Sequence, residues 1–250
     1  MFAAAVPKAT VAEVFDAAYA ASAREYRTEY YYKNLIVSRI VFGRHSPRTA
    51  AALVELGAGA SIADVVVVNG TTTAYEIKTD FDDFTRLPAQ LGDYRACFER
   101  TYVVVSESRS ARALIEVPTE FGVIAVGARG RLSERRPARG GLDGLRPGAM
   151  FRLLHQREVL DVLADTSGYT VDVPPARLWS RTFEIFSSLP VDVAHHHTTR
   201  HLRLRGQRAA ELATKVPASL RARAYDVPVS RAAGGRITRR LQEKASTLLV

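Results

Sequence analysis

The chain has 250 residues, of which 47% are hydrophobic and 24% charged. This is the composition of a globular protein, so disorder along the whole chain is excluded. The single cysteine, Cys97, excludes an intramolecular disulfide and a cysteine-rich zinc site. No apolar run approaches the roughly 20 residues that cross a bilayer, and the N-terminus lacks the pattern of a secretory signal. We therefore expect a cytoplasmic protein with no membrane partner.

The net charge of +9 is unevenly distributed along the chain. Residues 1–125 hold 13 basic against 15 acidic residues, whereas residues 126–250 hold 22 against 11, with arginine outnumbering lysine 20 to 2 there. The planar guanidinium suits phosphate, and a basic surface attracts a polyanion such as DNA. The charge favours nucleic acid as the partner, although a high-GC genome would also enrich arginine over lysine.

The first half of the chain predicts an α/β arrangement. Apolar positions at helical spacing begin it, and Gly43 ends the helical part. A run of β-branched residues and an Asn69-Gly70 turn then predict a buried hairpin. The expected elements are helices at 9–42 and 86–100, with strands at 51–56, 62–68, 71–78, 102–106 and 121–126. Helices that alternate with strands in this order are typical of α/β folds.

The second half predicts a different organisation. Residues 127–148 are rich in glycine, arginine and proline, which indicates a break in regular structure. Helical patterns follow at 150–163 and 176–188, and the last 50 residues are basic and less regular. We therefore predict a core domain over residues 1–127 and a basic, mainly helical accessory region over residues 128–250.

Three charged residues of the hairpin indicate a chemical site. Side chains alternate along a strand, so Glu76 and Lys78 point to one face, and the turn brings Asp64 beside them. Unpaired charges at the end of a buried sheet are costly, whereas a hard cation such as Mg²⁺ prefers carboxylate and carbonyl oxygens. We expect Asp64, Glu76 and the Ile77 carbonyl to bind Mg²⁺, for which Mn²⁺ can substitute. Lys78 would orient or help to deprotonate the attacking water.

The spacing of these residues resembles a known signature. Asp64 followed by Glu76-Ile77-Lys78 is similar to the motif of the PD-(D/E)XK nuclease superfamily, with Ala63 in place of its proline. Gln90 and Tyr94 resemble the Q-x-x-x-Y motif of its RecB-like nucleases, where they would contact the substrate backbone or brace the lysine. The stretch 26–107 is also similar to an uncharacterised bacterial and phage PD-(D/E)XK-like family.

This resemblance implies both a fold and an activity. The fold is a restriction-endonuclease-like core, a central mixed sheet flanked by helices. The activity is metal-dependent hydrolysis of phosphodiester bonds in nucleic acid, DNA in preference to RNA, and the family suggests a role in conflict between phages and bacteria. Nucleases of this superfamily often add a carboxylate from the first helix or strand. Glu55 is our preferred candidate and Glu29 the second, the alternative being that both are ordinary solvated glutamates.

Other residues leave alternatives open. The basic residues Arg129, Arg131, Arg135 and Arg136 lie in a predicted loop that either follows a phosphate backbone or is a flexible linker. His197 and His201 are one helical turn apart, but without the glutamate of H-E-x-x-H they are predicted to be polar surface residues. Two rival functions also stay open, a nucleic-acid-binding protein that does not cut and a regulatory module. The sequence is compatible with a homodimer or a partner protein.

Overall fold

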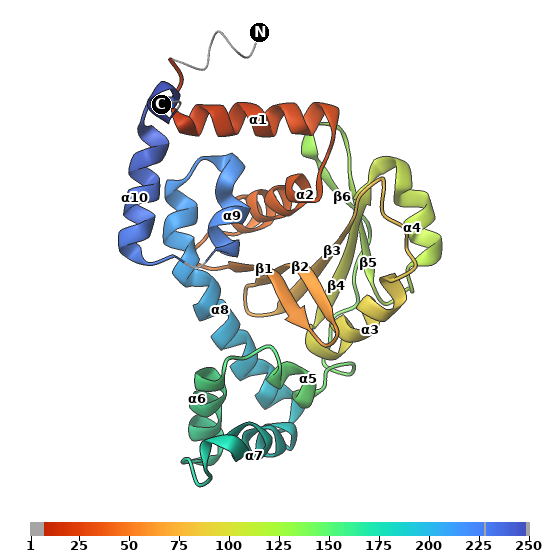
Figure 1. Cartoon of the computed structure of the whole chain (residues 1–250). Helices are drawn as coiled ribbons and strands as arrows, with labels where there is room; N and C mark the ends of the chain where they lie inside the picture. Colours follow the sequence, from red (N-terminus) through yellow and green to blue (C-terminus); the bar gives the residue numbers. More distant parts are fainter. Residues whose placement is uncertain (1–7, 228, 249–250) are drawn as a thin grey trace.

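The computed structural model describes residues 8–227 and 229–248, and its centre is a six-stranded mixed sheet (Figure 1). The strands lie side by side in chain order: β1 (Ala51–Ala58), β2 (Ser61–Val68), β3 (Thr72–Lys78), β4 (Arg100–Ser106), β5 (Gly122–Val126) and β6 (Leu132–Arg136). β1, β2 and β3 form an antiparallel meander, β3, β4 and β5 are parallel, and β6 is antiparallel to β5. The carboxyl ends of the three parallel strands therefore lie at the same end of the sheet.

Helices cover both faces of this sheet. They are α1 (Val11–Glu25), α2 (Glu29–Ile36) with its π-helical continuation η1 (Val37–Arg44), α3 (Leu87–Cys97), α4 (Ser110–Glu116), α5 (Pro147–Phe151), α6 (Gln156–Ser167), α7 (Pro175–Ser187), α8 (Val191–Lys215), α9 (Arg221–Asp226) and α10 (Arg231–Gln242). Short 3₁₀ turns are η2 (Glu107–Arg109), η3 (Ala128–Gly130), η4 (Ala218–Leu220) and η5 (Ala245–Leu248).

Two hydrophobic clusters hold the layers together. Val66 and Val68 of β2 belong to the cluster that includes α3 and α4, and α5 to α7 continue this cluster below the sheet in Figure 1. Val65 and Val67 belong to the cluster on the opposite face, with α2, η1, α9 and α10. Because both faces of β2 are covered, its run of valines is hydrophobic throughout instead of alternating with polar residues.

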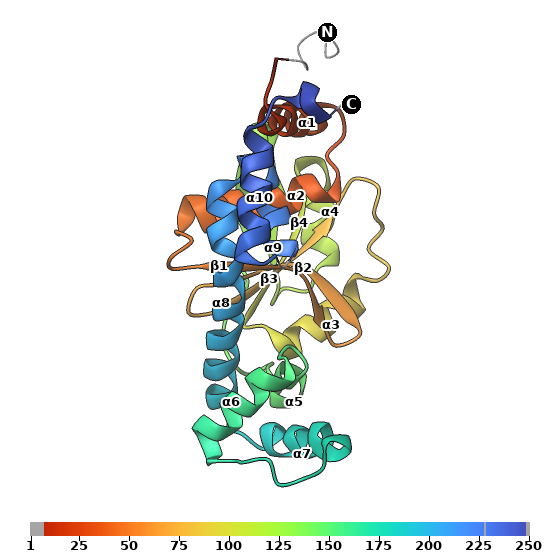
Figure 2. The same cartoon turned by 60° about the vertical axis from the view of Figure 1, so that its left-hand side comes forward.

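Helix α8 joins the two clusters past the edge of the sheet. Leu202 packs in the α3-side cluster and Ala210 in the α2-side cluster, and Figures 1 and 2 show the helix running past β1. Gly206 lies at the crossing, where an added Cβ would be 2.6 Å from the Ala52 carbonyl oxygen. The absence of a side chain at this position lets the helix approach the strand closely.

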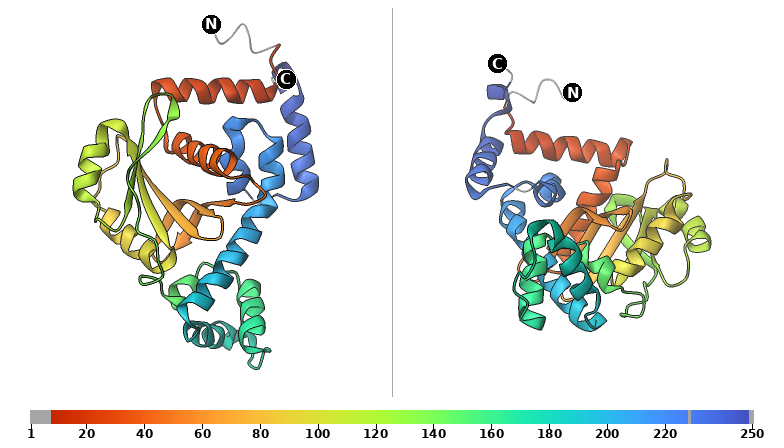
Figure 3. Two further views of the ribbon diagram at one scale, coloured as in Figure 1. Left: turned by 180° about the vertical axis from the view of Figure 1, so that it is seen from behind. Right: turned by 60° about the horizontal axis from the view of Figure 1, so that its bottom comes forward.

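The two ends of the described chain also meet. Figure 3 shows the start of α1 beside the C-terminal end. Val11 N donates a hydrogen bond to the Glu243 carbonyl oxygen at 2.9 Å, and Thr10 forms a bridge with Lys244. Residues on both sides of the predicted division at 127 share one sheet, because β6 pairs with β5. The second half also packs on the first through α8, which contacts β1. Within residues 8–227 and 229–248, no helix is both long enough and apolar enough to cross a membrane.

The α/β prediction is confirmed, with corrections in the second half. The predicted helix over 150–163 is two helices, because His155 and Glu158 cap the start of α6. The last 50 residues were predicted to be less regular, but the described ones, 201–227 and 229–248, form most of α8 together with α9 and α10. The buried face of α8 consists there of small apolar residues such as Ala210 and Ala213. Because many arginines lie between them, the helical spacing of these apolar residues is hard to recognise in the sequence. The predicted basic loop contains the strand β6.

Candidate functional site

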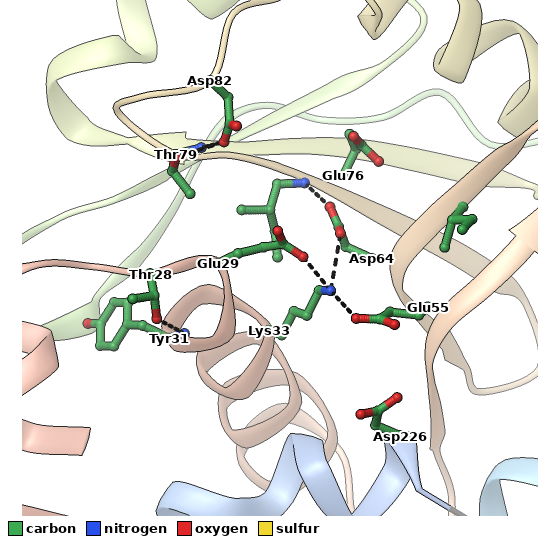
Figure 4. Close-up of polar contacts among 12 residues, drawn as sticks. Thr28, Glu29, Tyr31, Lys33, Glu55, Asp64, Glu76, Thr79, Asp82 and Asp226 are labelled. Carbon is green, nitrogen blue, oxygen red and sulfur yellow. Dashed lines mark hydrogen bonds and ion pairs between the residues drawn. The ribbon is translucent and has the colours of Figure 1, made fainter. Parts of the chain in front are cut away.

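The candidate site lies where β2 and β3 separate. Their ladder runs from Val68 opposite Thr72 to Val65 opposite Tyr75 and ends there. Beyond it, Asp64 Oδ2 accepts a hydrogen bond of 2.7 Å from the main-chain nitrogen of Ile77 (Figure 4). The carboxylate of Asp64 thus takes the place of a main-chain acceptor where the two strands separate. We call this place, between Asp64 of β2 and Glu76–Lys78 of β3, the opening.

Glu76 and Lys78 lie on one face of the sheet, as the strand alternation predicted, and this face meets α3. Lys78 Nζ lies 2.9 Å from Glu76 Oε1 and 2.9 Å from Gln90 Oε1. Tyr94 Oη lies 2.8 Å from Glu76 Oε2 and 2.7 Å from the Ile62 carbonyl oxygen. Both charged side chains are buried, with Glu76 only 2% exposed. The two residues of the Q-x-x-x-Y pair therefore fix the two charged residues of β3.

Lys33 approaches the same opening from α2, on the other face of the sheet. Its ammonium contacts Glu29, and it lies 2.8 Å from Glu55 Oε1 and 3.5 Å from Asp64 Oδ1 (Figure 4). The sequence analysis did not select Lys33. The available signal was its position four residues after Glu29, which places the two side chains on one helix face.

An irregularity in β1 directs Glu55 to this cluster. Val54 pairs with Val65 and Leu56 with Ala63, so Glu55 and Asp64 are opposite one another but outside the ladder. Glu55 has a φ of 55°, in the left-handed region that is uncommon for residues other than glycine. As a result the side chain turns toward α2, whereas a regular strand would direct it toward α3. Backbone strain of this kind is typical of functional sites.

The charges in the opening influence one another. Burial, followed by the negative charge of Glu76, raises the pKa of Asp64 well above its ordinary value, and the Ile77 N–H and Lys33 oppose this only in part. Burial lowers the pKa of Lys33, but its hydrogen bonds with Glu29 and Glu55 outweigh burial, so the net effect is a raised pKa. Hydrogen bonding to Lys33 lowers the pKa of Glu55.

The carboxylates of Asp64 and Glu76 and the main-chain carbonyl of Ile77 are oxygen groups of the kind that a hard divalent cation takes. Asp64 Oδ2 accepts from the main-chain nitrogen of Ile77, the residue that follows Glu76, so the two carboxylates come from adjoining positions of β2 and β3. The Ile77 N–H points toward β2, and in an extended strand the carbonyl of the same residue points to the same side. Mg²⁺ commonly takes only one or two protein carboxylates, with water and phosphate completing its shell. Among residues 8–227 and 229–248 there is no cluster of three or more His, Cys, Asp or Glu residues that would hold a metal.

The four predicted nucleic-acid contacts have different environments. Arg135 forms an ion pair with Glu107, and the Arg136 guanidinium donates to main-chain carbonyl oxygens, including that of Val117 at 2.8 Å. Arg129 and Arg131 are exposed, and their guanidinium groups have no polar partner in the part of the chain that the structure describes. They directly follow β5 at the carboxyl edge of the parallel strands, which is also where β3 ends at Lys78.

The histidine prediction needs a correction. His201 is buried, with 8% of its surface exposed, because it lies on the face of α8 that packs into the protein. Its prediction as a surface residue was therefore wrong, whereas His197 is half-buried. Neither belongs to a metal-binding cluster among the described residues.

Comparison with known proteins gives a family. The sequence profile of bacteriophage P4 protein cII matches residues 22–215. Protein cII of Enterobacteria phage P4 is 34% identical over 62 residues, which cover 25% of this chain and 24% of that relative, so the chain spans about a quarter of the relative's length. The SPO1766 protein of unknown function from Silicibacter pomeroyi is similar in structure, with a TM-score of 0.34 and 20% identity over 50% of this chain and 87% of that one. The profile match extends over well more than half of the sequence, and the chain therefore belongs to the bacteriophage P4 protein cII family.

Proposed function

We propose that this protein is a metal-dependent nuclease with a restriction-endonuclease-like core, and that it hydrolyses phosphodiester bonds in DNA in preference to RNA. The observation that carries the proposal is the opening between β2 and β3. Asp64 accepts a hydrogen bond there from Ile77 N, next to Glu76 in the chain, and Lys78 is held beside Glu76 by Glu76 itself and by Gln90. Charged side chains such as Glu76 and Lys78, buried at the end of a sheet, cost stability, which favours a chemical role for them over a purely structural one.

Each residue of the site has a role in this proposal. Asp64, Glu76 and the Ile77 carbonyl would hold Mg²⁺, with Mn²⁺ as a substitute. The bound ion would polarise the phosphate and lower the pKa of a water molecule. The Lys78 ammonium would orient the attacking water and offset negative charge that develops on the phosphate. Tyr94 keeps Glu76 in place by donating a hydrogen bond to Oε2.

The basic residues indicate how the substrate would bind. Arg129 and Arg131 lie near the carboxyl ends of the parallel strands, and Lys78 is the last residue of β3 at that same end of the sheet. A phosphate backbone that follows this end of the sheet would meet both guanidinium groups and then the opening. Contacts of this kind are independent of sequence and weaken with salt.

The test is cleavage by the purified full chain. Supercoiled plasmid, linear duplex and single-stranded DNA and RNA are incubated with Mg²⁺, Mn²⁺ or EDTA, for wild type, Asp64→Ala, Lys78→Ala and the surface control Lys215→Ala. We expect cutting that needs the metal, is retained in the control, and falls about 100-fold or more in both site variants. Circular dichroism establishes that the variants are folded. Equal cutting by wild type and Asp64→Ala, or no metal-dependent cutting, would contradict the proposal.

A non-cleaving nucleic-acid-binding or regulatory protein is the second candidate. The observation in its favour is that both oxygens of Glu76 already accept hydrogen bonds, from Lys78 and Tyr94, so this carboxylate is satisfied without a metal. This candidate predicts salt-sensitive binding of DNA without cleavage in the same experiment. Sedimentation with and without DNA would show whether either function involves a homodimer.

A further inference from the structure

Two lysines reach the opening from opposite faces of the sheet. Lys78 comes from β3 and is held on the α3 side by Gln90. Lys33 comes from α2 and contacts Glu29, Glu55 and Asp64. Asp64 therefore joins the two sides, because its Oδ1 lies 3.5 Å from Lys33 Nζ and its Oδ2 accepts from Ile77 N, next to Glu76.

Lys33 is buried whereas its two glutamate partners are exposed, so the glutamates do not need its charge to balance theirs. The side chains of Glu29 and Glu55 are 55% and 56% exposed, so water alone would solvate their charges. Lys33 is buried and Asp64 is half-buried, with side chains 7% and 14% exposed. Glu29 and Glu55 thus hold a buried ammonium next to Asp64, and Glu55 adopts a strained backbone conformation to do so.

The charges of the cluster set the number of metal ions that it accommodates. With Asp64 ionised, as it would be beside a bound cation, four carboxylates face two ammonium groups: the carboxylates are Glu29, Glu55, Asp64 and Glu76, and the ammonium groups are Lys33 and Lys78. The remaining two negative charges match one divalent cation. A second divalent cation would need the space and the carboxylates that Lys33 already occupies.

We propose that Lys33 is a positioning residue, a built-in cation that takes the place of a second divalent ion and restricts the site to one metal between Asp64 and Glu76. The inference rests on the metal site of the proposed function. A lysine ammonium is a compact point charge, so it balances the carboxylates on the α2 side without supplying the open coordination positions of a metal. Catalysis would then depend on one ion and Lys78.

The experiment counts Mn²⁺ ions bound to the full chain, by isothermal titration calorimetry and by electron paramagnetic resonance of free Mn²⁺. The variants are Lys33→Met, which removes the charge, and Lys33→Arg, which retains it. Lys215→Met is the matched control, because Lys215 also pairs with a glutamate four residues earlier, Glu211, but is exposed. We expect one ion in wild type, Lys33→Arg and Lys215→Met, and two in Lys33→Met.

A second variant keeps the inference testable if Lys33→Met does not fold. The double substitution Glu29→Gln and Glu55→Gln leaves Lys33 in place and removes two exposed charges. The cluster then has no surplus negative charge, and we expect Mn²⁺ affinity to fall at least about tenfold although neither glutamate is a proposed metal ligand. Unchanged affinity in this double variant would overturn the inference.

The outcomes separate this inference from the proposed function. Two ions in wild type, or one ion in Lys33→Met with unchanged affinity, would overturn the role of Lys33 and leave the nuclease proposal standing. No ion in wild type but one in Lys33→Met would support Lys33 as the resident cation and contradict a metal-dependent nuclease. No ion in either protein would overturn both.

Discussion

The phenolic oxygen of Tyr94 lies 2.8 Å from Glu76 Oε2 and joins α3 to the central strand β3. Tyr94 is fully buried and Glu76 nearly so. Burial and the charge of Glu76 raise the pKa of the Tyr94 hydroxyl, so it stays protonated and able to donate. The same oxygen lies 2.7 Å from the carbonyl of Ile62, in the strand that carries Asp64. This one hydroxyl therefore links α3 to both strands of the opening.

Replacement of Tyr94 by phenylalanine tests this link. The substitution removes only the hydroxyl, and leaves the buried carboxylate of Glu76 with one donor fewer. We expect the free energy of unfolding to fall by about 1–3 kcal/mol, measured by urea denaturation. Tyr102→Phe is the control, because the Tyr102 hydroxyl bonds the exposed Glu134. If both variants lose the same free energy of unfolding, the contact of Tyr94 with Glu76 contributes no more to stability than an exposed hydrogen bond.

Two helical glycines give a matched pair for packing. At Gly206 in α8, an added Cβ would meet the Ala52 carbonyl oxygen at 2.6 Å, whereas at Gly235 in α10 it would meet nothing within 4 Å. We expect Gly206→Ala to destabilise the protein by about 1–3 kcal/mol, because α8 must move away from β1. Gly235→Ala should stabilise it by about 1 kcal/mol through helix propensity. Thermal and urea unfolding measure both, and a stabilised Gly206→Ala would refute the close crossing.

Arg136 and Arg131 are predicted to have different roles. The Arg136 guanidinium donates to carbonyl oxygens of Phe121 at 2.9 Å and Val117 at 2.8 Å, and so fixes the end of α4 against β5. We expect Arg136→Ala to lower the free energy of unfolding by about 2 kcal/mol. Arg131→Ala should leave stability unchanged and weaken binding to DNA, with a smaller dependence of affinity on salt. Filter binding at several salt concentrations decides this, and the reverse pattern would be evidence against both assignments.

The ion pair of Glu158 with Arg205 predicts a dependence of stability on pH. Burial raises the pKa of Glu158, but the hydrogen bonds from Arg205 and His155 N outweigh it, and the pKa is held below its ordinary value of 4.5. A carboxyl whose folded pKa is lowered contributes stability above its unfolded pKa and loses it as the pH falls through the folded value. Between pH 6 and pH 3, we therefore expect wild type to lose more stability than Glu158→Gln. Parallel curves of unfolding free energy against pH for the two proteins would contradict this.

The sequence alone indicated much of the sheet and its charged residues. Alternation along β3 placed Glu76 and Lys78 on one face, and the four-residue spacing of Gln90 and Tyr94 placed both on the face of α3 that meets them. These are local rules, since the backbone geometry of one strand or one helix fixes the direction of each side chain. The valine run and the Asn69-Gly70 turn likewise located the hairpin.

Only the tertiary structure showed the contribution of α2 and of the second half of the chain. Lys33 meets Glu55 and Asp64 because three elements pack together at the opening, and no spacing in the sequence encodes that distance. Glu55 turns toward Lys33 through a positive φ, which a regular strand pattern does not predict. Helices α8 to α10 are stabilised by burial of small apolar residues against distant elements, so their composition alone gave a weak signal. The sequence determined which residues are charged and which local face they share, whereas long-range packing decided which of these charges meet.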